Sequence, residues 1–165
     1  MTRPVAISLS EDGTRSVVLA KGTCLIWDIR KPAAEHPVRV VTGQDRFRCS
    51  ASSSTGRWLV TDSSAGIEVR DLSAPAAATH PVGKAPSIAT LTITDDARFV
   101  VSGSSDGVVR LWDAENSRQL ASFHADSQIT TCAVVCRPDP VIICGTSSGA
   151  VHFLRLEQPA ISTAP

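Results

Sequence analysis

Hydrophobic residues occur along the chain in short runs separated by clusters of Gly, Asp, Asn, Ser and Pro. Many of these runs are β-branched, as in SVVLA (16–20), FVVSG (99–103) and VIICG (141–145). The runs lack the spacing of an amphipathic helix, and short β-branched runs bounded by turn residues are typical of strands. The pattern therefore predicts an all-β chain.

One unit of this pattern, SGSSDGVVRLWD (102–113), recurs along the chain as LAKGTCLIWD, TDSSAGIEVRD and CGTSSGAVHFLRL. A glycine closes the turn in each copy: Gly22, Gly66, Gly107 and Gly149, spaced by 44, 41 and 42 residues. Glycine suits such turns because a tight hairpin requires positive φ. A constant period of this size indicates a repeat architecture.

Each copy is expected to contribute strands a, b and c to one small antiparallel sheet. A fourth strand, d, is predicted at 38–42 and 119–123, and the Pro-rich stretch 72–86 allows only a short edge strand. In the last copy, either AIST (160–163) forms a late fourth strand or the sheet lacks one.

A single small sheet cannot bury both faces, whereas sheets stacked around an axis cover one another. We therefore predict a single β-propeller domain over 1–165 with four blades. The expected limits are 4–42, 46–82, 87–123 and 128–157, followed by a tail at 158–165.

The hairpin SGSSDGVVRLWD, with LIWD earlier, resembles the WD-repeat β-propellers over nearly the whole chain. The last copy looks like the final blade of bacterial WD-repeat proteins, in which the propeller often forms the sensor half of a signalling ATPase or effector. The Ala- and Arg-rich composition also fits a bacterial source.

The resemblance implies a hydrogen-bonded set in each blade, made by a Ser or Thr, an Asp, a Trp and a His. Matching positions are Ser102, Asp106 and Trp112 in the third copy and Trp27 in the first. The third copy has no aligned His, and His124 falls one place early for the fourth. Because no copy carries the full set, we expect apolar packing to hold the blades together.

Family members usually close a ring with about seven blades, and propellers generally have roughly four to eight. Four copies leave three possibilities: a tight four-bladed ring, two chains forming an eight-bladed ring, or part of a longer polypeptide. If four blades do not close, two apolar blade faces stay open, which a soluble monomer rarely tolerates. The pair of chains and the longer polypeptide are favoured equally, ahead of the tight four-bladed ring.

Composition and charge limit the classes of partner that we expect. The formal net charge is zero, the pI is near 6.9 and basic residues are scattered, so we expect no nucleic-acid or membrane partner. The chain has no apolar stretch of signal-peptide length, which predicts a cytoplasmic protein.

We expect no enzyme activity, cofactor or metal. The five cysteines form no CxxC pair and are interpreted as reduced, strand-buried thiols, and Cys132 and Cys136 lack partners for a metal site. Catalytic motifs are absent from the sequence, and the predicted channel-lining positions Ala6, Arg48, Ala89 and Thr130 offer no convergent acid–base groups. The three tryptophans are expected to be buried between blades.

The resemblance implies a protein-interaction scaffold that binds a protein or peptide through the d–a and b–c loops. The alternatives are a self-assembling structural unit and a fragment of a larger signalling protein. Candidate binding positions in these loops are Lys21, Asp45, Arg46, Lys84, Ser105, Asp106, His124, Asp126 and Gln128.

Overall fold

The computed structural model describes residues 6–10, 13–20, 23–30, 39–42, 49–74, 79–136 and 140–156. Within these ranges the chain forms fifteen strands, β1 to β15, and no helix. The prediction of an all-β chain is confirmed.

The strands form four separate antiparallel sheets in which neighbours follow chain order. The first sheet contains β1 (Ala6–Leu9), β2 (Arg15–Ala20), β3 (Thr23–Asp28) and β4 (Arg39–Thr42). The second contains β5 (Cys49–Ser52), β6 (Trp58–Ser63), β7 (Gly66–Asp71) and β8 (Thr79–Gly83). The third contains β9 (Ile88–Ile93), β10 (Phe99–Ser104), β11 (Val108–Asp113) and β12 (Arg118–His124). The fourth contains β13 (Ile129–Cys136), β14 (Pro140–Thr146) and β15 (Val151–Arg155).

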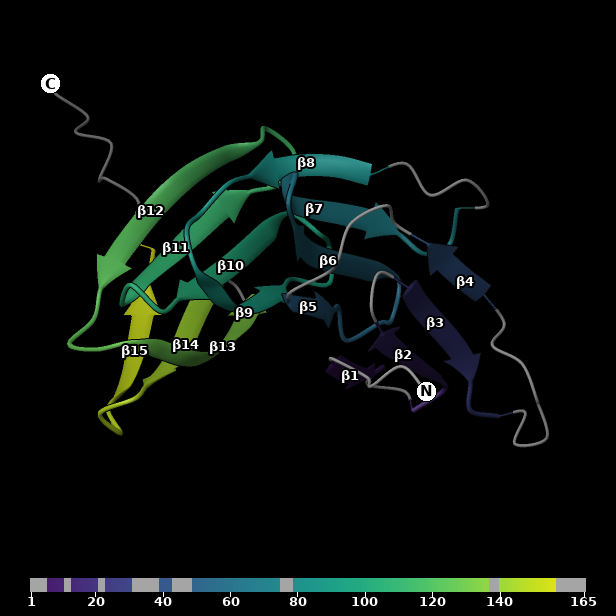
Figure 1. Cartoon of the computed structure of the whole chain (residues 1–165), viewed down its shortest axis with the longest axis horizontal. Helices are drawn as coiled ribbons and strands as arrows, with labels where there is room; N and C mark the ends of the chain where they lie inside the picture. The colour runs from purple at the N-terminus through teal and green to yellow at the C-terminus, as the bar shows by residue number, and fades with distance from the viewer. Residues whose placement is uncertain are drawn as a thin grey trace, which may run out of the picture.

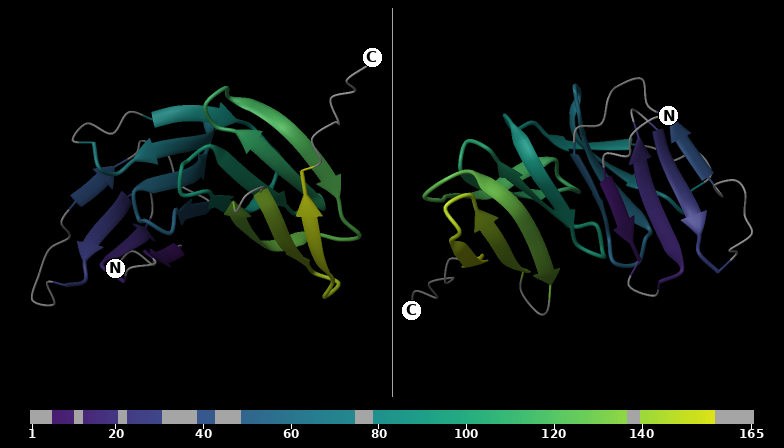
Figure 2. Two further views of the ribbon diagram at one scale, coloured as in Figure 1. Left: turned by 180° about the vertical axis from the view of Figure 1, so that it is seen from behind. Right: turned by 60° about the horizontal axis from the view of Figure 1, so that its bottom comes forward.

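The four sheets lie side by side along an arc, with β1–β4 at one end and β13–β15 at the other (Figures 1 and 2). The first strands of neighbouring sheets contact each other, β5 with β9 and β9 with β13. This is the arrangement of consecutive blades in a β-propeller, so the sheets are named blades 1 to 4 in chain order. The described part of the chain forms an open arc of a propeller.

Apolar side chains pack between the blades in two clusters. The cluster between blades 2 and 3 contains Val60, Ile67, Val69, Val82, Leu91, Ile93, Val100, Trp112 and Ala114. The cluster between blades 3 and 4 contains Phe99, Val101, Val109, Leu111, Ile129, Ile142 and Cys144. Blade 3 therefore buries both of its faces, as the repeat predicts. Each fully buried aliphatic side chain contributes about 1.5–3 kcal/mol relative to an exposed one.

The weak fourth strand of the second copy forms as expected. β8 lies at the outer edge of blade 2 and pairs only with β7, so Pro81 removes no ladder hydrogen bond on its free side. In blade 4 the described residues form three strands, and β15 is the outer one. The candidate fourth strand at 160–163 lies outside the described residues.

The turn glycines have the backbone conformation that the hairpin pattern predicts. Gly66, Gly107 and Gly149 have φ values of 121°, 82° and 90°, which side chains with a Cβ rarely adopt. A Cβ on Gly107 would also lie 3.1 Å from the carbonyl oxygen of Ser127 in the next loop. Gly22 lies outside the described residues.

Candidate functional site

The loops between blades and the b–c turns lie on one rim of the arc. This upper rim is defined here by residues 84–87, 105–107, 125–128 and 147–149. Backbone hydrogen bonds connect its parts: Ser105 N donates to Ser87 O over 2.9 Å and Ser147 N to Gln128 O over 2.9 Å. Each interblade loop is thereby held against the turn of the blade that it enters.

The structure places six predicted binding residues on or directly beside this rim, each with an exposed side chain. They are Lys84, Ser105, Asp106, His124, Asp126 and Gln128. Lys21, Asp45 and Arg46 lie outside the described residues. A binding role for the six residues stays a prediction.

In blade 3 the family's hydrogen-bonded set is present in part. The buried indole Nε1 of Trp112 donates to Ser102 Oγ over 2.9 Å. Asp106 accepts from Val108 N and from Arg110 Nη2, each over 3.0 Å. Desolvation is the largest single influence on Asp106 and opposes its ionisation, but the hydrogen bonds from Arg110, Ser104 and Val108 together with the charge of Arg110 outweigh it and lower the Asp106 pKa. Arg110 thus supplies the charged partner that an aligned His does not.

Blade 4 contains a polar cluster that the sequence did not predict, named here the loop clasp: Asp126, Ser148 and His152. Asp126, in the loop entering the blade, accepts from Ser148 Oγ over 2.5 Å and from His152 Nε2 over 3.3 Å. The Ser148 hydrogen bond, followed by that of His152, lowers the Asp126 pKa. An ionised carboxylate only accepts hydrogen bonds, so His152 donates from Nε2.

The family pattern places a His in the loop and an Asp in the turn, whereas the loop clasp places the carboxylate in the loop and the imidazole on β15. Ser148 and His152 both donate to the same carboxylate, which is not the serine–histidine–aspartate order of a nucleophilic triad. The His152 ring also packs against Phe123 of blade 3, with a centroid separation of 5.2 Å. The clasp therefore joins the loop, the turn and the third strand of blade 4.

The opposite rim, the lower rim, consists of the turns at 53–57, 95–98 and 114–117. Here Asp95 of blade 3 accepts from Ser54 N over 2.8 Å and from Ser54 Oγ over 2.6 Å. These hydrogen bonds join blade 2 to blade 3 at their a–b turns.

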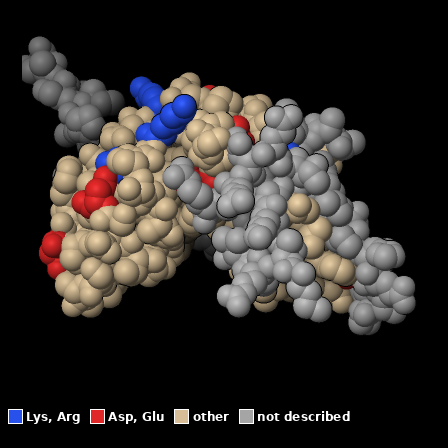
Figure 3. Space-filling model, viewed as in Figure 1, with Lys and Arg blue, Asp and Glu red and all other residues tan. Residues whose placement is uncertain are grey.

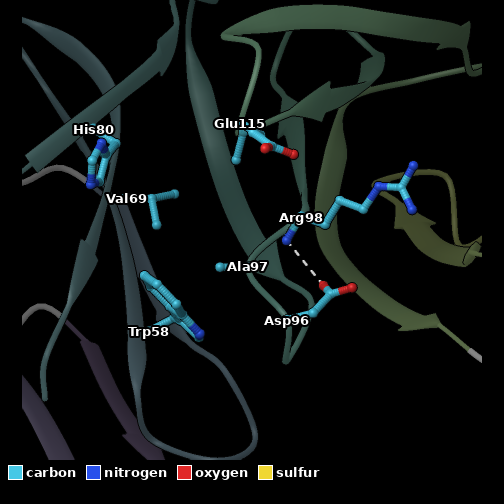
Figure 4. A pocket seen from close by; sticks show the side chains of 8 residues that line it. Trp58, Val69, His80, Asp96, Ala97, Arg98 and Glu115 are labelled. Atoms are coloured by element: carbon cyan, nitrogen blue, oxygen red, sulfur yellow. Dashed lines mark hydrogen bonds between the residues drawn. The ribbon is translucent and has the colours of Figure 1, made fainter.

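A cavity of about 590 Å³ lies beside the lower rim, between blades 2 and 3 (Figure 4). This inter-blade cavity is lined by Trp58, Val69 and His80 from blade 2 and by Asp96, Ala97, Arg98, Ala114 and Glu115 from blade 3. The expectation that Trp58 is buried between blades is wrong in part. Its ring is half-buried and borders the cavity because it stands at the first position of β6, at the rim.

The described thiols are held in their neutral form. Burial, with a smaller contribution from Asp62, raises the Cys49 pKa to about 11, and burial raises the Cys132 pKa to about 12. Burial also raises the Cys144 pKa. No three His, Cys, Asp or Glu side chains in the described ranges come together in a way that would hold a metal ion.

Charged side chains are few and separate on the face seen in Figure 3, where most described residues are neither acidic nor basic. The described ranges contain no helix long and apolar enough to cross a membrane.

The two end blades expose apolar side chains on their outer faces. Phe153 of β15 is 72% exposed, and Val151 and Val135 of blade 4 are also exposed. In blade 1, Ile7 is 65% and Leu9 63% exposed. These are strand residues of the type that the interior of blade 3 buries.

Comparison with known proteins supports the expected family. A family model described as TEP-1 C-terminal beta-propeller matches residues 84–156. "MST50-interacting protein 11" of Pyricularia oryzae is 30% identical over 127 residues, which cover 77% of this chain and 34% of the relative. "Small ribosomal subunit protein RACK1" of Neurospora crassa gives the same identity and coverage. "Transducin-like enhancer protein 2" of Mus musculus is 24% identical over 133 residues, 77% of this chain and 17% of the relative.

These matches support a relationship between this chain and the WD-repeat β-propellers. All three relatives are eukaryotic, so the finer resemblance to bacterial sensor proteins is not confirmed.

Two solved structures have the same fold as this chain. A chain in "Crystal Structure of Mitotic Checkpoint Complex" matches with a TM-score of 0.72 and 22% identity, covering 94% of this chain and 50% of that one. The beta-propeller domain of Myceliophteria_thermophila Cps50 (Swd1) matches with a TM-score of 0.71 and 12% identity, covering 99% and 55%. The chain thus spans about half of these solved chains and a third or less of the curated relatives.

Proposed function

We propose that this WD-repeat chain is a non-catalytic interaction module whose upper rim binds a protein or peptide. The observation that carries this proposal is the arrangement of six exposed polar residues on loops that backbone hydrogen bonds hold together. Binding residues on loops fixed by a rigid scaffold need little ordering when a partner arrives. The names of two similar proteins, an interacting protein and a checkpoint complex, also favour this role.

Selection from a displayed random-peptide library tests this proposal. The chain is immobilised, and the affinity of enriched peptides is then measured for the Lys84→Ala/Gln128→Ala variant, which removes one cation and one amide from the upper rim. We expect at least about fivefold weaker binding, since truncating an important interface contact costs more than about 1 kcal/mol.

The matched control is Arg118→Ala/Gln119→Ala, which removes one cation and one amide from exposed positions on β12 outside the upper rim. This variant should bind the selected peptides as the parent chain does. Failure to enrich any peptide, or equal affinity of both variants for the enriched peptides, would contradict the proposal.

A second candidate function, self-assembly, is favoured by the exposed apolar faces of blades 1 and 4. We propose that a second copy of the chain covers these faces and that the pair closes one ring. Blade 1 of each chain then packs against blade 4 of the other chain. This is a heterologous contact, and the ring closes after two copies. The exposure of Phe153, Ile7 and Leu9 in one chain provides the apolar surface for both contacts.

Sedimentation equilibrium at micromolar concentration tests self-assembly. The parent chain and Gln119→Glu, an exposed substitution away from the end faces, should be dimers. Phe153→Glu should be a monomer, because it places a charge in the contact. A concentration-independent monomer of the parent chain would exclude the pair and leave further blades of a longer polypeptide to cover the faces.

A further inference from the structure

The inter-blade cavity has two chemically different walls. Blade 2 provides the ring of Trp58, the side chain of Val69 and the imidazole of His80 (Figure 4). Blade 3 provides Asp96 and Glu115 on the other side, and in Figure 4 the Asp96 carboxylate is hydrogen-bonded to the backbone N of Arg98. An aromatic and apolar wall facing an acidic one complements a ligand that is both flat and cationic.

The acidic wall carries net negative charge into the cavity. Asp96 accepts from Thr94 Oγ1 over 2.5 Å and from Arg98 N over 3.0 Å. Desolvation is the largest single influence on Asp96 and raises its pKa, but these bonds, a further backbone hydrogen bond and the charge of Arg98 together outweigh it and lower the pKa, so the carboxylate is ionised at neutral pH. Glu115 also lines the cavity and is exposed.

The two arginines near the cavity already contact aromatic rings, Arg57 that of Trp58 and Arg98 that of Phe99. The guanidinium of Arg98 lies 5.0 Å from the centre of the Phe99 ring, and Figure 4 shows it extending away from Trp58. Arg57 does not line the cavity, and its Nη2 pairs with Asp71 over 2.9 Å. Among the lining residues, therefore, no guanidinium lies between the two acidic residues and the aromatic wall.

The same rim contains two internal examples of a guanidinium on an aromatic ring. Arg57 lies 4.8 Å from the centre of the Trp58 ring, and Arg98 stacks in the same way on Phe99. A planar guanidinium combines such stacking with hydrogen bonds to carboxylates, which the compact ammonium of lysine does less well. The cavity offers both kinds of contact to a third guanidinium.

We propose that the inter-blade cavity binds an arginine side chain of a protein partner, stacked against Trp58 and paired with the carboxylates of Asp96 and Glu115. Its volume of about 590 Å³ lies within the range of pockets that bind small molecules, so it accommodates this side chain with part of the adjoining peptide. This site is on the lower rim and does not depend on binding at the upper rim.

Titration with N-acetyl-arginine methylamide, followed by NMR of the indole N–H groups, tests the site. The chain has three tryptophans, and Trp58→Phe identifies the Trp58 signal. We expect a saturable shift of that signal with the arginine compound, a weaker effect with the lysine analogue and none with the uncharged, isosteric citrulline analogue.

Glu115→Gln removes one charge from an exposed position and should weaken binding of the arginine compound about fivefold, the effect of roughly 1 kcal/mol. The charge-matched control is Glu68→Gln on β7, which does not line the cavity. It should bind as the parent chain does. The proposal is overturned if the Trp58 signal does not shift, if citrulline or lysine binds as well as arginine, or if Glu115→Gln keeps the parent affinity.

Discussion

The indole N–H of Trp112 donates to the hydroxyl of Ser102 across two strands of blade 3, with a distance of 2.9 Å. Both residues are buried, and the Trp112 ring packs in the cluster that joins blades 2 and 3. The hydrogen bond fixes the ring's orientation while its apolar surface joins the two blades. The hydrogen bond between Ser102 and Trp112 within blade 3 therefore also positions the ring that packs against blade 2.

Ser102→Ala is expected to lower the free energy of unfolding by about 1–3 kcal/mol, because the buried Trp112 N–H loses its acceptor without gaining water. Urea denaturation measures this change. The exposed Ser105→Ala should change the free energy of unfolding by less than about 0.5 kcal/mol. Equal effects of the two substitutions would show that the Trp112–Ser102 hydrogen bond does not stabilise the fold.

Gly83→Ala is expected to destabilise the chain through steric overlap. A Cβ at this position would overlap Trp112 Cζ3 and lie 2.7 Å from Cε3, and the ring cannot withdraw without breaking its bond to Ser102. Overpacking of this kind costs about 1–3 kcal/mol in the free energy of unfolding.

The Gly83→Ala variant should also show an altered near-ultraviolet circular dichroism, because the Trp112 ring is displaced. The comparison substitution is Gly149→Ala, which has open space around its Cβ position and therefore tests only the cost of positive φ. An unchanged tryptophan spectrum in Gly83→Ala would contradict the predicted overlap.

The carboxyl group of Asp71 is expected to titrate near pH 2. Its hydrogen bond from Arg57 is the main cause that lowers the Asp71 pKa from 3.8 to about 2. Because the folded pKa lies below the unfolded one, the resulting stabilisation is present above about pH 4 and is lost as the pH falls to about 2. The stabilisation is small, since the Arg57 side chain is 55% exposed and solvent screens the pair.

NMR titration of the Asp71 carboxyl carbon measures this pKa. Arg57→Gln should move the midpoint most of the way back to 3.8, while Ser73→Ala, which removes only a neutral hydroxyl donor to Asp71, should move it less. A midpoint near 3.8 in the parent chain would contradict the Arg57–Asp71 pairing.

The thiols of Cys49 and Cys132 are expected to resist alkylation at pH 8 in the folded chain. Their pKa values of about 11 and 12 leave very little of the reactive thiolate. Iodoacetamide should therefore modify them roughly 100-fold more slowly in the folded chain than in urea, as measured by mass spectrometry of the two peptides. Fast modification of the folded chain at either position would contradict their burial.

The strands and the turns could be predicted because their causes are local. Gly66, Gly107 and Gly149 mark the hairpins in the sequence and have positive φ in the structure. The Pro-rich stretch 72–86 predicts a short edge strand, and β8 is one. Such predictions need only the hydrophobic–polar pattern within each run and the residue types at each turn.

The side-chain partnerships were predicted less well, because the family pattern indicates which residue types to expect and not which atoms meet. It selected Ser102 and Trp112, which do form a hydrogen bond, but it gave no partner for Asp106, which pairs with Arg110 four positions later. It assigned no partner to His152, although Asp126, in the loop entering the same blade, supplies one. A search for a carboxylate in the loop as well as a histidine would have found this pair.

The sequence by itself determined the strands, the period near 42 residues and the stacking of blades, because these follow from short-range alternation, turn geometry and the need to bury apolar faces. The tertiary structure decided which side chains from different blades meet. The loop clasp, the Ser54–Asp95 bonds and the inter-blade cavity all join residues far apart in the chain. Their geometry depends on the angle and register between neighbouring blades, which the packing of whole sheets sets.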